Sequence, residues 1–173
     1  MKKFNKLKNF LELIFNIDKN ISFTIADIGA HPYKQSEEPF HILIDFFPNS
    51  KIYAFDIDKQ ELENLNKSAK KGIRYFPHAL GKKNEKRKFY ITENPGCSSL
   101  YKPNENLMRL YNNLHFAYLK KEIEIETITL DHFKKEQNID KFDFIKLDVQ
   151  GAELDILNGA SNSLKDVTFI ISE

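Results

Sequence analysis

Acidic residues and a glycine occur where apolar runs of the sequence end, and these residue types can bind a ligand and move a proton. The positions are Asp27 with Gly29, Asp56, and Asp148. A carboxylate at the end of a strand can accept hydrogen bonds from both hydroxyls of a ribose, and a carboxylate can also act as a general base. A glycine lets the backbone approach a ligand closely. The pattern indicates a site for a nucleotide-like ligand.

The apolar runs that carry these residues predict a parallel sheet. Strands are expected at 23–28, 51–55, 73–76, 88–92, 122–128, 142–147 and 168–172. One helix is expected from the capping box of Asp58 and Glu61 to Gly72, and another over about 151–158. This alternation favours an α/β fold with a doubly wound, mainly parallel sheet and helices on both faces. In such sheets the ligand lies beyond the carboxyl ends of the strands, so the acidic positions should meet there.

Each of these residues also has a purely structural interpretation. Gly29 could be a turn glycine, and Asp56 could form half of an Asx turn ahead of Asp58. Asp148 could cap the helix that begins near Gly151. Because Gly29 and Asp56 end consecutive strands, we favour the cofactor interpretation for that pair.

The sequence after Gly29 bears on which cofactor fits. Ala30, His31, Pro32 and Tyr33 follow it, so the three-glycine fingerprint of a dinucleotide site is missing, and no phosphate-binding P-loop occurs anywhere. Asp27 suits a cationic or amine-bearing ligand better than a phosphate. S-adenosylmethionine has an amine, a sulfonium and a ribose but no phosphate, and therefore fits better than NAD. A nicotinamide-dependent oxidoreductase is disfavoured.

Composition and residue spacing exclude several classes of protein and of binding site. The 173 residues suggest one domain, and 26 Lys and Arg against 25 Asp and Glu leave a net charge of +1, without the basic excess of a dedicated nucleic-acid binder. A single cysteine, Cys97, precludes an internal disulfide and a Cys-rich metal site, and the histidine spacing supports no metal. No transmembrane run or signal peptide is recognised. We expect a cytoplasmic protein, and no signal indicates an oligomeric state.

Three segments have open interpretations. Residues 4–17 have helical apolar spacing, which predicts a helix over 1–20 that packs on a domain over 21–173; the alternative is a membrane-surface helix. The basic residues of 82–88 indicate a solvated hairpin tip or, alternatively, a contact to phosphate or an anionic glycan. The aromatic segment 101–118 indicates a core insert or a lid over an acceptor.

These motifs together resemble the FkbM-type family of S-adenosylmethionine-dependent methyltransferases. The shorter matches are Asp27-Ile28-Gly29-Ala30, Tyr53-Ala54-Phe55-Asp56, Ala79-Leu80-Gly81, Cys97-Ser98-Ser99-Leu100 and Ile128-Thr129-Leu130-Asp131. The most specific is Lys-Leu-Asp-Val-Gln-Gly-Ala-Glu-Leu at 146–154, which is similar to the family's block at every fixed position. The resemblance covers about 23–173.

The resemblance and the residues together imply roles. Cofactor contacts are expected from Asp27, Gly29, Ala30, Asp56, Ile57, Ala79, Leu80 and Asp148. Asp148 is the candidate catalytic base. Substrate contacts are expected from Ser98, Ser99, Gln150 and Glu153, although Glu153 could also be a favourable first-turn carboxylate of a helix.

The resemblance implies methyl transfer to a hydroxyl of a saccharide or glycoconjugate. Two departures bear on this: a proline-containing loop over 31–40 replaces the usual further glycine, and the sequence ends where two more strands are expected, so the domain could be truncated. The alternative is a non-catalytic S-adenosylmethionine-binding or scaffold domain.

Overall fold

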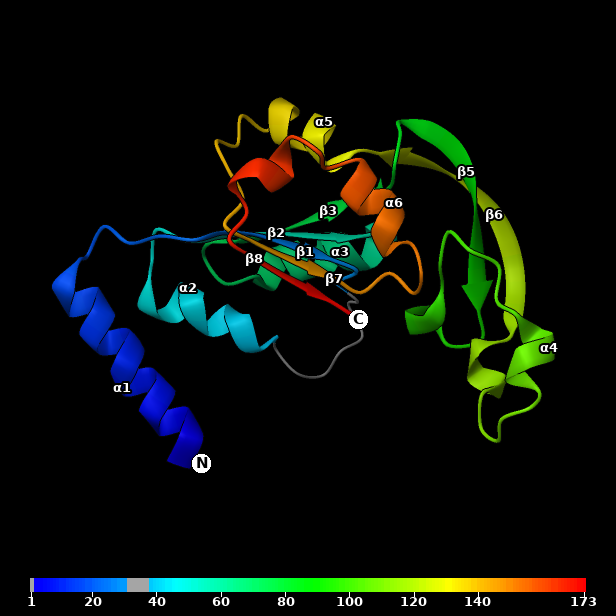
Figure 1. Cartoon of the computed structure of the whole chain (residues 1–173), viewed down its shortest axis with the longest axis horizontal. Helices are drawn as coiled ribbons and strands as arrows, with labels where there is room; N and C mark the ends of the chain where they lie inside the picture. The colour runs from blue at the N-terminus through cyan, green and yellow to red at the C-terminus, as the bar shows by residue number, and fades with distance from the viewer. Residues whose placement is uncertain (1, 31–37) are drawn as a thin grey trace.

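Two sheets organise the chain, as the computed structural model shows for residues 2–30 and 38–173 (Figure 1). The larger sheet is wholly parallel, with strand order β3-β2-β1-β7-β8. Its strands are β1 (Thr24–Ile28), β2 (Lys51–Asp56), β3 (Ile73–Pro77), β7 (Phe144–Leu147) and β8 (Phe169–Ser172). Because β1 lies between β2 and β7, the strand order reverses at β1, as in a doubly wound fold. The predicted α/β architecture is confirmed.

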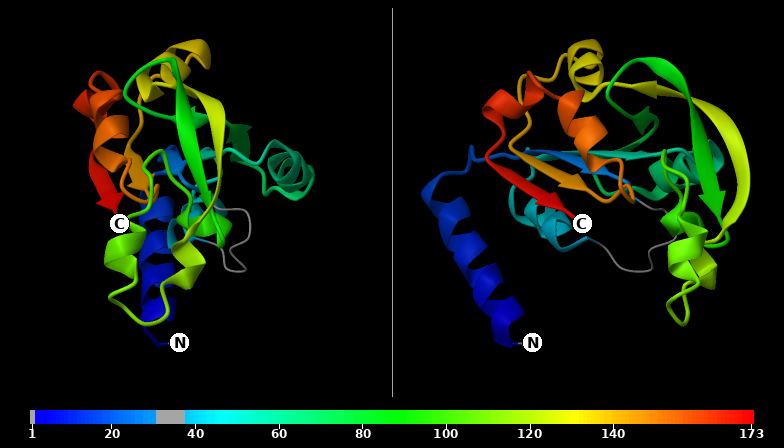
Figure 2. Two further views of the ribbon diagram at one scale, coloured as in Figure 1. Left: turned by 90° about the vertical axis from the view of Figure 1, so that its right-hand side faces the viewer. Right: turned by 45° about the vertical axis from the view of Figure 1, so that its right-hand side comes forward.

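The second sheet has strand order β4-β6-β5 and is built around a long antiparallel pair. Its strands are β4 (Ala79–Leu80), β5 (Glu85–Thr92) and β6 (Leu119–Ile128). Figures 1 and 2 show β5 and β6 as a curved ribbon across the end of the parallel sheet toward which its strands point. The second sheet therefore faces the carboxyl ends of the parallel strands.

Helices cover both faces of the parallel sheet. The helices of the described residues are α1 (Lys2–Ile17), α2 (Ile42–Phe46), α3 (Lys59–Ser68), α4 (Glu105–Met108), α5 (Leu130–Glu136) and α6 (Glu153–Asn158), with short 3-10 turns at 39–41, 95–97, 115–117 and 163–166. Helix α4 lies apart from the parallel sheet, beside the β5–β6 ribbon (Figure 1). Figure 2 shows α5 and α6 over one face and α2 on the other. Helix α3 lies beside the edge strand β3, where Asn66 hydrogen-bonds both the N–H and the carbonyl of Tyr75 at 2.9 and 2.8 Å.

The core lies on the two faces of β1 and β2. On the α5 side, Phe133 meets Phe55 and Phe76 edge-on, with ring centroids 4.7 and 4.8 Å away. On the α2 side, Ile44 packs in a buried cluster with Ile25, Ile52 and Ala54 of the sheet. Strands buried on both faces read as continuous apolar runs, which is why the sequence identifies them.

Helix α1 contacts the rest of the chain over a narrow stripe. Leu11 is buried. The ring centroids of Phe15 and of Phe47, the residue that follows α2, lie 6.1 Å apart. Other apolar side chains of α1 remain exposed, among them Phe10 at 58% and Ile17 at 77%. The helix therefore buries only part of its apolar face.

Several boundaries differ from the prediction. Helix α3 ends at Ser68, so Gly72 does not cap it; with φ of 98°, Gly72 instead forms the turn into β3. In the segment 101–118, which was expected to be a core insert or a lid, α4 ends at Met108, and Leu110 beyond it is 78% exposed. Helix α5 was not predicted; it is short, with Thr129 capping the backbone N–H of His132 at 3.0 Å.

Gly29 permits the close approach of β1 and β7. Its φ is 78°, and a Cβ at this position would lie 1.9 Å from the carbonyl oxygen of Asp148. The N–H groups of Gly29 and Ala30 both donate to the carbonyl of Phe55, at 3.0 Å. The chain therefore turns sharply at the end of β1, and only glycine fits there.

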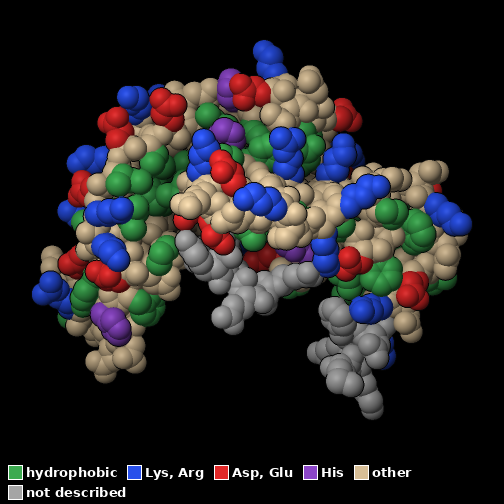
Figure 3. Space-filling model, turned by 180° about the vertical axis from the view of Figure 1, so that it is seen from behind, with side chains coloured by type: hydrophobic (Ala, Val, Ile, Leu, Met, Phe, Trp, Pro, Cys, Tyr) green, Lys and Arg blue, Asp and Glu red, His purple; other side chains and the backbone are tan. Residues whose placement is uncertain are grey.

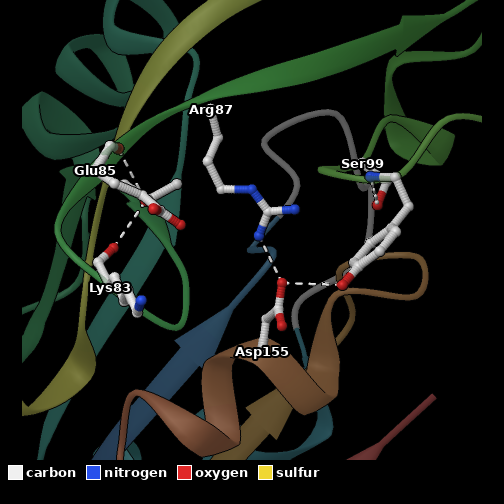
Figure 4. Close-up of polar contacts among 7 residues, drawn as sticks. Lys83, Glu85, Arg87, Ser99 and Asp155 are labelled. Carbon is white, nitrogen blue, oxygen red and sulfur yellow. Dashed lines mark hydrogen bonds and ion pairs between the residues drawn. The ribbon is translucent and has the colours of Figure 1, made fainter.

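An ion-pair cluster joins the β5–β6 ribbon to α6 (Figure 4). Arg87 of β5 pairs with Asp155 of α6 at 2.5 Å, and the Tyr101 hydroxyl donates to the same carboxylate oxygen at 3.0 Å. The hydrogen bond from Arg87 lowers the pKa of Asp155 below its ordinary value against the opposing effect of burial, and Tyr101 adds to the lowering. Arg87 therefore holds the second sheet against the first.

The other basic residues of this segment face solvent. Lys86 pairs with Glu124 at 3.5 Å and Lys88 with Glu122 at 3.0 Å, across the β5–β6 pair. Beside them, the buried Thr127 hydroxyl lies 2.9 and 3.1 Å from the carbonyl oxygens of Lys83 and Glu85, which fixes the turn into β5 (Figure 4). The basic segment is a hairpin with cross-strand ion pairs.

We predict that Gly29→Ala lowers the free energy of unfolding by more than about 2 kcal/mol, since a backbone clash adds to the cost of a left-handed conformation. Gly151→Ala is the matched control. Gly151 also has a positive φ, 100°, but apart from Gly151 itself and its two chain neighbours, no heavy atom of the described residues lies within 4 Å of the position its Cβ would take. That variant should lose only about 1 kcal/mol in urea unfolding. Equal losses would show that the close approach is unimportant.

We predict that Arg87→Met lowers the free energy of unfolding by about 1 kcal/mol at pH 7. Because the folded-state pKa of Asp155 is lowered, the pair stabilises the protein above the unfolded-state value of roughly 3.9, and this stability is lost as pH falls through the folded-state pKa. The difference between parent and variant should therefore begin to shrink below about pH 4 and disappear as pH falls through the folded-state pKa. Lys86→Met, which removes an exposed pair, is the control and should change little. A pH-independent difference would contradict this account.

Candidate functional site

A pocket of about 470 Å³ lies between the carboxyl ends of the parallel strands and the second sheet. Its strand-end side is lined by Ile28, Gly29, Phe55, Asp56, Ile57, Asp58, His78, Ala79, Leu80, Asp148, Val149 and Ala152. Its other side comes from the β5–β6 ribbon and the turn that follows β5. The pocket thus occupies the topological switch point at which doubly wound sheets bind ligands.

Six of the predicted cofactor residues meet at this pocket. They are Gly29, Asp56, Ile57, Ala79, Leu80 and Asp148. They lie at or just after the carboxyl ends of four parallel strands, β1, β2, β3 and β7, and are brought together because these strands end at one edge of the sheet. Ser98, a predicted substrate residue, lines the opposite side.

Asp56 forms a turn and also lines the pocket. Its Oδ1 accepts from the N–H of Ile57 at 2.6 Å and from that of Asp58 at 3.3 Å. Asp58 in turn caps α3 by accepting from the N–H of Glu61 at 3.1 Å. The Asx turn considered from sequence is therefore present, and it fixes the carboxylate of Asp56 at the pocket rather than removing it.

A buried lysine of β7 links the carboxylates near the pocket. The Nζ of Lys146 lies 3.4 Å from Asp27, 3.5 Å from Asp148 and 3.9 Å from Glu38, and it donates to the Gly29 carbonyl at 3.0 Å. The Lys146 side chain is 5% exposed and that of Asp27 is 2% exposed. Ionised groups are rarely buried unless they are paired, so this cluster fixes the relative positions of the β1 and β7 ends.

The loop after β7 orients Asp148. The Gln150 amide donates to Oδ1 of Asp148 at 2.7 Å, and Gln150 adopts a positive φ of 56°. Glu153 folds back to accept from the N–H groups of Val149 and Gly151 at 3.2 and 3.1 Å. Glu153 therefore satisfies the loop backbone just before α6, and Asp148 is held by contacts on both of its oxygens.

The structure does not bring every predicted site residue to the pocket lining. Asp27 and Ala30 are buried, and Asp27 lies behind the pocket wall in contact with Lys146. Ser99 is 5% exposed, and its backbone pairs with Tyr90. Gln150 and Glu153 contact the loop instead of the pocket. The proline-containing loop falls mostly at 31–37, outside the described residues.

Burial shifts the pKa values of His78 and Cys97. Burial lowers the pKa of His78, although Glu136 opposes this, so its imidazole is neutral at pH 7; it lines the pocket and meets the Phe133 ring at 6.0 Å. Burial raises the pKa of the Cys97 thiol, and the negative charge of Asp148 adds to the effect. Cys97 is therefore a poor nucleophile.

Apart from Ser98, sequence reasoning missed the residues of the second wall of the pocket. It is lined by Phe89, Ile91, Thr92, Glu93, Pro95, Gly96, Ser98, Leu100, Lys120 and Lys121. It also missed Lys146, for which a signal was present: a lysine inside an otherwise apolar strand requires a buried partner.

Other site types receive no support from the described residues. Within 2–30 and 38–173, no three His, Cys, Asp or Glu side chains gather so as to hold a metal ion. None of the helices in these ranges has the length and apolar character needed to span a membrane. On the face shown in Figure 3, basic and acidic side chains are interspersed.

We predict that Lys146→Met lowers the free energy of unfolding by about 3 kcal/mol, because it removes one partner of a buried ion pair. The double variant Lys146→Met with Asp27→Asn should be more stable than the sum of the two single losses predicts. Urea unfolding of the parent, both single variants and the double variant measures this coupling. Strictly additive losses would mean that the two groups do not interact.

Comparisons with known proteins identify relatives. The chain is 23% identical over 154 residues to the 2-O-methyltransferase NoeI of Sinorhizobium fredii, covering 86% of this chain and 62% of the relative. It is 34% identical over 62 residues to the hexuronic acid methyltransferase AglP of Haloferax volcanii, covering 36% of this chain and 26% of the relative. The chain thus spans less than two thirds of the length of either relative. No solved structure matches.

The family assignment rests on a broader match. The sequence model of the family described as "Methyltransferase FkbM domain" matches residues 27–173. This range contains all five parallel strands except the first three residues of β1, and every residue described above as lining the pocket. The predicted resemblance is confirmed, and the chain belongs to the FkbM methyltransferase domain family.

Proposed function

We propose that this chain is an S-adenosylmethionine-dependent O-methyltransferase that acts on a hydroxyl of a saccharide or glycoconjugate. The observation that carries the proposal is the pocket at the switch point of the sheet, where Asp56 and Asp148 come together in a chain of the FkbM family. The two relatives' names support the acceptor class, since one is a 2-O-methyltransferase and the other a hexuronic acid methyltransferase.

The residues at the strand ends fit this cofactor. The carboxylates of Asp56 and Asp58 suit ribose hydroxyls and positive charge, whereas a phosphate would be repelled there. The apolar side chains of Ile57, Ala79 and Leu80 suit an adenine ring. A volume of about 470 Å³ lies within the usual range of ligand pockets.

In this proposal each part of the pocket has a task. When bound, the cofactor supplies a methyl group on a cationic sulfur. Asp56 accepts hydrogen bonds from the ribose hydroxyls, and Asp148 accepts the proton of the acceptor hydroxyl on a carboxylate oxygen. The β5–β6 ribbon excludes water and aligns the acceptor. Such alignment can lower the activation free energy by roughly 7–11 kcal/mol in favourable cases. The positions of the strand ends therefore matter more for the reaction than any single group.

Binding and turnover test the proposal separately. In calorimetry, S-adenosylhomocysteine should bind the chain and NAD should not. With labelled S-adenosylmethionine, label should then appear in an alkali-stable methyl ether of a saccharide. Failure of S-adenosylhomocysteine to bind would contradict the cofactor, and binding without transfer to any saccharide would contradict the proposed activity and favour a binding domain.

We predict that Asp56→Asn weakens S-adenosylhomocysteine binding by about tenfold or more, since hydrogen bonds to a charged group are lost. Asparagine keeps an oxygen for the Ile57 N–H, so the turn and the thermal stability should be preserved. Asp45→Asn is the control: Asp45 lies outside the pocket lining, half-exposed on α2, and pairs with Lys70 at 3.4 Å. Unchanged affinity in Asp56→Asn would remove Asp56 from the site.

A further inference from the structure

Charge is divided between the two sides of the pocket. The strand-end side carries Asp56, Asp58 and Asp148, whereas the opposite wall carries two consecutive lysines of β6, Lys120 and Lys121, and one carboxylate, Glu93. The acidic side suits the ribose and cationic sulfur of the proposed cofactor. The lysines lie on the ribbon opposite the acidic side, where the proposed acceptor would enter. Binding of a neutral sugar alone would not require these two positive charges.

A β-bulge explains how two consecutive residues of one strand reach the same pocket. Ile91 pairs with Lys121, but Thr92 pairs with Leu119, so Lys120 is an extra residue in β6. In a regular strand, neighbours point to opposite faces. A bulge re-aims a side chain, and bulges are frequent beside active sites. The irregularity therefore places both lysines at the pocket.

The two lysines differ in their partners. Lys120 lies 3.8 Å from Glu93, another lining residue, in an exposed pair. Lys121 forms no ion pair within 4.0 Å with any described residue, although the next residue, Glu122, pairs with both Lys88 and Lys102. Lys121 is thus a cation at the pocket whose charge the described residues do not neutralise by direct contact.

The surroundings of Lys121 suit a sugar ring. Ile91 lies directly opposite Lys121 across the β5–β6 pair, and cross-strand partners share a face. Phe89, two residues earlier, also lines the pocket. Apolar side chains next to a cation provide contact for a sugar face and a partner for a charged substituent on it.

Resting on the proposed function, we propose that the acceptor is an anionic saccharide and that Lys121, assisted by Lys120, binds its anionic group and sets the specificity of methyl transfer. The shared chemistry is a negative oxygen substituent on the sugar, such as a carboxylate, a phosphate ester or a sulfate ester. The ammonium of Lys121 orients this substituent while Asp148 faces the hydroxyl on the other side of the pocket.

The test compares the parent chain with Lys121→Met, and with Lys86→Met as a matched control. Lys86 is exposed on the same ribbon and lies outside the pocket lining. Four probes are used: glucose, glucuronic acid, glucose 6-phosphate and glucose 6-sulfate. Binding of each to the chain loaded with S-adenosylhomocysteine is measured by ligand-observed NMR, which needs no turnover. Methyl transfer is measured in parallel where it occurs.

We expect at least one anionic probe to bind the parent more tightly than glucose. Lys121→Met should weaken that binding by about fivefold, as for a partly exposed ion pair, while glucose binding is unchanged and Lys86→Met behaves as the parent. The probe that loses most identifies the substituent. Added salt should weaken the anionic probe selectively. Equal binding of glucose and all three anions, or no effect of Lys121→Met, would overturn the inference.

A competing role for Lys121 is separated by the same variants. If it bound the carboxylate of the cofactor instead, Lys121→Met would weaken S-adenosylhomocysteine binding in calorimetry, and that result would also overturn the inference. Failure of the parent to bind S-adenosylhomocysteine would instead contradict the proposed function itself. The two failures are therefore read from different measurements.

Discussion

The carbonyl oxygen of Asp148 occupies the space in which a side chain at position 29 would begin, and the ends of β1 and β7 meet through this contact. Lys146 holds the same two ends from inside the sheet, because its ammonium reaches the Gly29 carbonyl and the carboxylates of Asp27 and Asp148. A steric requirement and a buried ionic cluster therefore fix one point in the fold. The position of Asp148 depends on both, and so does the wall of the pocket on that side.

The opposite wall depends on weaker connections. The β5–β6 ribbon belongs to a separate small sheet, which meets the parallel sheet through β4 and through the Arg87 cluster on α6. Arg87 and Asp155 are partly exposed, so their pair contributes less than a buried one. The pocket is thus formed between a rigid strand-end wall and a wall held by surface contacts. The wall proposed to bind the acceptor is therefore the one that packing holds less firmly.

Much of the fold could be predicted from the sequence because parallel strands buried on both faces are continuous apolar runs, and all five were found. The residues at their ends followed from one rule about strand termini, which placed Gly29, Asp56 and Asp148 correctly at the pocket. Short elements such as α2 and α5 were missed, since a helix of a turn or two has too little periodicity. Gly72 was wrongly predicted to cap α3, because a glycine near the end of a helix can either cap that helix or form the turn that follows it.

The rest of the site depends on contacts between residues distant in sequence. Asp27 was predicted to contact the cofactor because it is acidic and precedes Gly29. The folded chain adds a partner that local sequence does not reveal, since Lys146, 119 residues later by their numbers, reaches the Asp27 carboxylate. The lysines of β6 were missed for a related reason. Strict alternation would send Lys120 and Lys121 to opposite faces, and only the register of β5 against β6 reveals the bulge that brings both to the pocket. Binding of the proposed acceptor thus rests on an irregularity that strand periodicity conceals, and alignment with Asp148 requires both pocket walls to keep their places.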